Sequence, residues 1–185
     1  MLSWLLLVTG ILAKFANDKG ESLELLELLQ DYLDGDHAGT ADDSADDGAS
    51  EAKMSGLATD FVAAFTGVGS PIAAGELDGS PASLAAVDRI LEDFFQQQQT
   101  LPEDLHLLAA AYVREVARAE YGGRFLRGED PDLFVLVVGE LECSTGVMAM
   151  GKVAKRARNG AEDSLEFFYA GIAPLLERGV SATLI

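Results

Sequence analysis

Residues 34–51 contain no large apolar side chain, and this gap divides the apolar residues of the chain into two groups. A segment of this kind buries too little surface to offset the conformational entropy that it loses on ordering. It is therefore predicted to be a flexible acidic linker. The linker separates a hydrophobic helical hairpin, predicted over residues 1–33, from a larger domain over residues 52–185.

Acidic residues concentrate in and just before this linker. The formal net charge is −18, and residues 18–51 hold twelve acidic residues against one basic residue. Nucleic-acid binding is disfavoured, because phosphate contacts require clustered Lys and Arg. The segregated charge favours an acidic surface that binds a basic protein partner, with solubility as the simpler alternative. Its candidate contact residues are Asp42, Asp43, Asp46 and Asp47.

The first thirteen residues are almost entirely apolar, and Lys14 then interrupts them. A bilayer span needs ~20 apolar residues, so this run is too short. A secretory signal has basic residues before its apolar stretch, and none precedes Leu2. A buried core helix is predicted, while a helix lying on a membrane stays open for residues 1–16. The single cysteine cannot form an internal disulfide, which favours a reducing, cytoplasmic location.

The rest of the chain has mainly helical periodicity, with a short region of strand composition. Helices are expected over residues 52–66, 81–95, 102–121, 151–158 and 162–178, and strands over 124–127, 133–138 and part of 141–148. The continuous apolar run 133–138 is typical of a strand buried on both faces, and Pro174 is expected to kink the last helix. The predicted fold class is α+β and mostly helical, with helices packed on a small antiparallel sheet of two or three strands.

Signatures of catalysis are missing from the sequence. It contains neither a G-x-S-x-G elbow nor an H-E-x-x-H pair. Cys143 would need a histidine base, but His37 falls in the predicted linker and His106 on a helix. Two histidines and one cysteine also cannot fill a tetrahedral zinc site without a carboxylate. The chain is therefore predicted to be no enzyme and to hold no cofactor or metal.

One segment is strongly basic. Four of the thirteen basic residues fall between positions 152 and 158. The functional interpretation is a site for an anion or an acidic partner, formed by Lys152, Lys155, Arg156 and Arg158. The favoured alternative is that these cations pair with Glu162, Asp163 and the acidic segment.

The C-terminal half resembles an uncharacterised bacterial domain family. The resemblance covers about residues 80–172 and depends on Tyr121-Gly-Gly-Arg-Phe125, Gly151-Lys-Val-Ala-Lys-Arg156 and Asn159-Gly-Ala-Glu-Asp-Ser-Leu165, followed by Phe168-Tyr169. Phe125 stands where that pattern has Trp. The family has no assigned activity, so the resemblance implies a bacterial source and an α+β domain without indicating a catalytic residue.

Two functional hypotheses follow. The first is a non-enzymatic protein-binding module, of an adaptor, chaperone-like or immunity type, that presents its acidic surface to a partner. The second is a structural or assembly subunit that associates through the hydrophobic hairpin, either as a homo-oligomer or at a membrane protein complex, since obligate interfaces resemble an exposed core.

Overall fold

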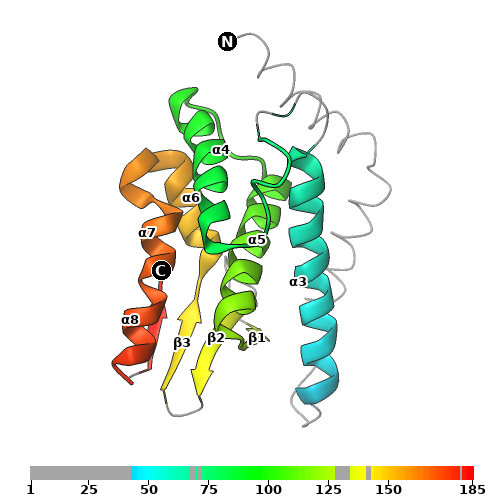
Figure 1. Cartoon of the computed structure of the whole chain (residues 1–185), viewed down its shortest axis with the longest axis vertical. Coiled ribbons are helices and arrows are strands. Elements are labelled where there is room, and N and C mark those ends of the chain that lie inside the picture. Colours follow the sequence, from blue (N-terminus) through cyan, green and yellow to red (C-terminus); the bar gives the residue numbers. More distant parts are fainter. Residues whose placement is uncertain (1–42, 67–69, 71, 128–133, 141–142, 180) are drawn as a thin grey trace.

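The computed structural model describes residues 43–66, 70, 72–127, 134–140, 143–179 and 181–185. Within them the fold is α+β and mostly helical, as predicted (Figure 1). The elements are α3 (Asp43–Phe65), the 3-10 turn η1 (Pro81–Ser83), α4 (Leu84–Gln96), α5 (Glu103–Tyr121), β1 (Arg124–Arg127), β2 (Phe134–Glu140), β3 (Cys143–Val147), α6 (Ala149–Asn159), the 3-10 turn η2 (Gly160–Asp163), α7 (Leu165–Ala170), α8 (Ile172–Glu177) and β4 (Ala182–Leu184). The predicted hairpin over residues 1–33 lies outside the described residues.

Helix α3 begins earlier than the sequence pattern indicates. The predicted linker extends to residue 51, but residues 43–51 are already helical. Their aspartates fall in the first turns, where negative charge favours a helix. Ser50 is buried, and a Glu51 carboxylate oxygen lies 3.7 Å from an Arg118 nitrogen of α5. Residues 43–51 therefore belong to α3 rather than to the predicted linker, although they contain no large apolar residue.

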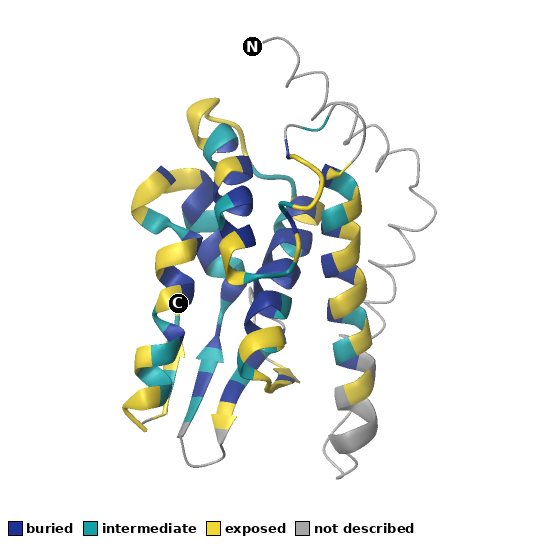
Figure 2. Ribbon diagram, in the orientation of Figure 1, coloured by how far each residue is buried: buried dark blue, intermediate teal, exposed yellow. Residues whose placement is uncertain are grey.

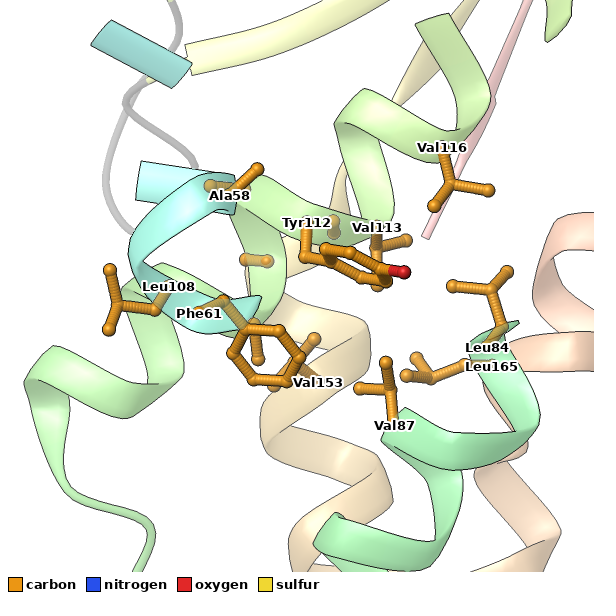
Figure 3. Packing of buried hydrophobic residues seen from close by; sticks show 14 of the residues in the cluster. Ala58, Phe61, Leu84, Val87, Leu108, Tyr112, Val113, Val116, Val153 and Leu165 are labelled. Carbon is orange, nitrogen blue, oxygen red and sulfur yellow. The ribbon is translucent and has the colours of Figure 1, made fainter. Parts of the chain in front are cut away.

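Helix α5 packs against both α3 and α6. Its central residues Ala109, Ala110 and Ala111 are fully buried, and such small side chains allow neighbouring helices to approach closely. Figure 3 shows side chains of several helices meeting in this core, where the ring centroids of Phe61 and Tyr112 are 5.2 Å apart. Full burial of one such aromatic ring stabilises the fold by about 1.5–3 kcal/mol. Buried residues gather where α4, α5 and α6 face one another (Figure 2).

The sheet has four strands in the order β1–β2–β3–β4. The first three are antiparallel, as predicted, and Leu136 lies between Phe125 and Val147 in register. Strand β4 was not predicted, and it pairs with β3 in parallel. A parallel pair needs a long crossover, which α6, α7 and α8 supply here. The sheet is therefore mixed, which corrects the predicted antiparallel sheet of two or three strands.

Strand β2 is not buried on both faces, contrary to the prediction. Leu136 and Val138 are fully buried, whereas Val135 and Val137 are only half-buried. Alternate residues of a strand point to opposite faces, and cross-strand partners share a face. The buried face of β2 therefore continues through Phe125 of β1, and the apolar composition of residues 133–138 overstates how much of the sheet is covered.

The predicted last helix over residues 162–178 is broken into three pieces. The turn η2 ends before Ser164, α7 ends at Ala170, and α8 begins at Ile172. Pro174 lies in the first turn of α8, where its missing N–H has no intrahelical partner to lose. The break at Ser164 has a tertiary cause, which the next subsection describes.

Candidate functional site

Arg156 of the basic helix α6 faces the protein interior and is only 5% exposed. Its Nε donates to Asp88 Oδ1 at 2.8 Å, and its Nη1 donates to Glu92 Oε2 at 2.7 Å. Nη2 donates to the Asp88 carbonyl oxygen at 2.9 Å. All three guanidinium nitrogens are thus bonded to one side of α4, an arrangement that fits the planar geometry of arginine.

Asp88 also holds the beginning of α7. Its carboxylate accepts hydrogen bonds from the Leu165 backbone N–H at 3.0 Å and from the Ser164 hydroxyl at 2.8 Å. Negative charge at this position satisfies the free N–H groups of a helix start. Ser164 is itself the N-cap of α7 and accepts from Phe167 N. One buried carboxylate therefore joins α4, α6 and α7, and this explains the break at Ser164.

A second ion pair connects α6 to η2. Lys152 Nζ donates to Asp163 Oδ1 at 2.7 Å, and Asn159 Nδ2 donates to Asp163 Oδ2 at the same distance. The hydrogen bond from Lys152 is the main cause of a lowered pKa for Asp163. The pKa of Glu92 is lowered too, first by its hydrogen bond from Gln96 and then by Arg156. We name Asp88, Glu92, Lys152, Arg156, Asp163 and Ser164 the ionic cluster.

The basic residues proposed from the sequence thus divide into two pairs. Lys152 and Arg156 are buried and bonded to carboxylates within the chain. Lys155 is half-buried, and Arg158 is exposed with its Nε 3.3 Å from Asn159 Oδ1. The pairing of Lys152 with Asp163 matches the alternative in which the cations pair within the chain. The partners of Arg156 were not foreseen, although Asp88 gave a signal, since it interrupts the apolar stripe of α4.

The acidic candidate residues lie near the start of the described chain, far in sequence from the basic helix α6. Asp43, Asp46 and Asp47 belong to the first turns of α3, and Asp42 lies outside the described residues. The structure therefore places three of the four on one helix end without describing their side chains.

A further polar group, missed by the sequence analysis, connects α7 to the end of α5. The Tyr169 hydroxyl donates to Glu120 Oε2 at 2.6 Å, and the rings of Tyr121 and Tyr169 lie 5.8 Å apart. Burial raises the pKa of the Tyr169 phenol, and the adjacent Glu120 carboxylate raises it further. Burial and Glu120 also raise the pKa of Tyr121. A phenol held neutral in this way stabilises the contact between the two helices.

His106 and Cys143, which the sequence analysis considered for catalysis and metal binding, lie on different elements. His106 Nε2 lies 2.7 Å from the Met150 carbonyl oxygen, while Cys143 begins β3. His37 lies outside the described residues. Within the described ranges, no three His, Cys, Asp or Glu side chains are grouped as metal ligands would be. None of the helices described there has both the length and the apolar character that a bilayer span requires.

Searches of family models, curated proteins and solved structures give no match to this chain. The resemblance to the uncharacterised bacterial family therefore stays a prediction.

The residues that carry that resemblance are, however, those of the ionic cluster and its surroundings. Lys152, Arg156, Asp163 and Ser164 make the bonds described above. Gly160 has φ +75°, and a Cβ placed there would lie 2.7 Å from the Phe95 ring. The part of this pattern that lies in residues 151–165 thus has a structural role in joining α6, η2 and α7 to α4.

Proposed function

We propose that this chain is a non-enzymatic protein-binding module that contacts a basic partner through its acidic surface. The observation that supports this proposal most directly is that two buried basic side chains are paired with carboxylates of the same chain. Lys152 and Arg156 are bonded to Asp163, Asp88 and Glu92, so neither cation is available to bind an acidic partner. With a net charge of −18, the chain attracts cationic surfaces over a distance of about a Debye length.

The placement of the acidic candidates supports the same proposal. Asp43, Asp46 and Asp47 stand at the beginning of α3, next to further acidic residues that precede them in the sequence. Charge of one sign at one place steers association and selects partners of the opposite sign. An adaptor, a chaperone-like protein and an immunity-type protein would all use such a surface. The proposal assigns the chain no catalytic step.

The test is capture of stoichiometric partners from the native host by tagged protein, at low and at high salt. The variant replaces Asp46 and Asp47 of α3 by Asn, and its control, matched in charge, replaces Glu103 and Asp104 of α5 by their amides. A partner that is lost at high salt and with the α3 variant, but kept with the control, supports the proposal. A partner captured equally by the α3 variant contradicts it.

The second candidate is an assembly subunit that associates through the apolar hairpin over residues 1–33. The half-buried apolar face of the sheet, which includes Val135 and Val137, favours this alternative because it gives association a further apolar surface. Here light scattering at high salt distinguishes the two candidates. An oligomer that persists at high salt and dissociates when residues 1–33 are removed supports assembly, whereas a monomer under both conditions contradicts it.

A further inference from the structure

The helix pair α7–α8 carries an exposed apolar strip. Phe167 is 80% exposed, although it is a large apolar side chain. Ala170 and Pro174 are exposed as well. Gly171 between the two helices keeps a helical backbone, with φ −72° and ψ −17°, so the spacing of three and four places Phe167, Ala170 and Pro174 on one face.

Strand β4 contacts the junction of the two helices. A Cβ added to Gly171 would lie 3.2 Å from Leu184 Cδ1, so the leucine side chain occupies the space that a larger residue would need. We define the α7–α8 strip as Phe167, Ala170 and Pro174.

This strip is held in a fixed position. The N-terminus of α7 is bonded to Asp88, which in turn binds the buried Arg156. On the buried side, Tyr169 is bonded to Glu120 of α5. Phe167 therefore projects from a helix anchored at both its beginning and its inner face. A partner that binds Phe167 therefore orders only this side chain and not the helix that carries it, which reduces the conformational entropy lost on binding.

The charges near the strip define the chemistry of its occupant. Glu162 of η2, Glu166 of α7 and Glu177 at the end of α8 are all exposed, as is the cation Arg178 that follows α8, so carboxylates outnumber cations here. A second copy of the chain would bring these carboxylates against one another, in a molecule of net charge −18. A segment with a large apolar side chain flanked by Lys or Arg would instead cover Phe167 and pair with the carboxylates, and its cation can also lie over the phenylalanine ring.

We propose that the α7–α8 strip is the docking surface for an amphipathic basic segment of a partner protein. This inference rests on the proposed function and deepens it, because it separates an apolar anchor at Phe167 from the acidic surface that attracts the partner. The acidic start of α3 accelerates the encounter, and the strip determines how long the complex persists.

The test uses fluorescence anisotropy with three labelled synthetic peptides: a lysine–leucine amphipathic helix, a lysine–serine peptide of the same charge and a glutamate–leucine helix. The expected result is binding of the lysine–leucine peptide above both others. Phe167→Ser is expected to weaken that binding at least about tenfold, as loss of an interface anchor does. Phe167→Tyr, which retains the ring, is expected to restore most of it.

The matched control is Leu126→Ser, since Leu126 is an exposed apolar side chain at the opposite end of the sheet order, on β1. Equal weakening by Leu126→Ser and Phe167→Ser overturns the inference, as does equal binding of the lysine–serine peptide. A dimer of the unbound protein that is lost with Phe167→Ser also overturns it, in favour of a second copy. If no peptide binds, the strip is not a docking surface, while the salt-dependent capture still decides the proposed function separately.

Discussion

Helices α6 and α7 follow one another along the chain. In both of them, the burial of some side chains is the opposite of what their polarity predicts. Helix α6 contains four basic residues, yet Lys152 and Arg156 are among the buried side chains of the protein. Helix α7 contains Leu, two Phe and Tyr, yet Phe167 is 80% exposed. Burial of a charge depends on whether a partner of opposite sign stands opposite it. Asp88 and Glu92 of α4 are those partners for Arg156, and Asp163 of η2 is the partner for Lys152.

The contrast also separates stability from binding. Side chains that face α4 are expected to determine whether the domain folds. Those that face solvent on α7 are expected to affect association alone. Single substitutions on each side of the two helices test this division directly, and the expected effects differ by several kcal/mol.

The largest effect is expected for Arg156→Ala on α6. The substitution leaves Asp88 buried without its cation, and breaking a buried ion pair costs about 3–5 kcal/mol. That loss corresponds to a fall of about 10 °C in Tm for a chain of this size. Urea unfolding monitored by circular dichroism measures the change. Arg158→Ala on the same helix is the control and is expected to change stability by less than about 0.5 kcal/mol. If Arg156→Ala and Arg158→Ala destabilised the protein equally, the buried and exposed faces of α6 would not differ in their contribution to stability.

The next effect concerns neighbouring residues of α7. Phe168→Ala is expected to cost about 3 kcal/mol, because Phe168 is only 4% exposed and its removal leaves a cavity. Phe167→Ala is expected to leave the free energy of unfolding within about 0.5 kcal/mol of the parent value. Both can be measured by thermal unfolding under identical conditions. A loss of several kcal/mol from Phe167→Ala would mean that this ring packs against the protein in solution, and would contradict the proposed strip.

A smaller effect is expected for Asp163→Asn, which removes the carboxylate bonded to Lys152. Its side chain is 20% exposed, so the loss near neutral pH is expected to be about 1 kcal/mol. Because the pKa of Asp163 is lowered in the fold, its stabilisation is present above the ordinary carboxyl pKa of about 4 and disappears as the pH falls below it. The difference between parent and variant should therefore shrink on acidification. A difference independent of pH would show that the charge of Asp163 is unimportant.

The sequence alone was sufficient to predict those helices and strands whose ends are determined by residues close by in the chain. Pro102 precedes α5, and Gly122, with φ +68°, ends it at the predicted residue. The β-branched composition of β2 likewise identified a strand. These features depend on backbone preferences of single residues, and they reach no further than a few positions along the chain.

The features that were not predicted from the sequence depend on contacts between residues that are distant along the chain. Strand β4 has three residues and exists because β3 offers it a pairing edge. The break before Ser164 depends on Asp88, which is 76 positions away. The candidate site shows the same limit. The spacing of Lys152 and Arg156 places them on one face of a helix. That this face is buried follows only from their carboxylate partners on α4 and η2.

The smallest effect is expected at Tyr169, on the side of α7 that faces α5. Removing its hydroxyl in Tyr169→Phe breaks the hydrogen bond to Glu120, which is exposed, so the loss near neutral pH is expected to be about 0.5–1 kcal/mol.

The pKa of Tyr169 is raised by burial and by Glu120. The neutral phenol is therefore favoured in the folded state, and its stabilisation is complete below the ordinary tyrosine pKa of about 10 and is lost as the pH rises above it. Unfolding free energies measured from about pH 9 to about pH 11 should fall more steeply for the parent protein than for Tyr169→Phe. Parallel curves would mean that Tyr169 ionises as readily in the folded as in the unfolded chain. The inner face of α7 would then lack this anchor, and the fixed position of Phe167 on its outer face would depend on Asp88 alone.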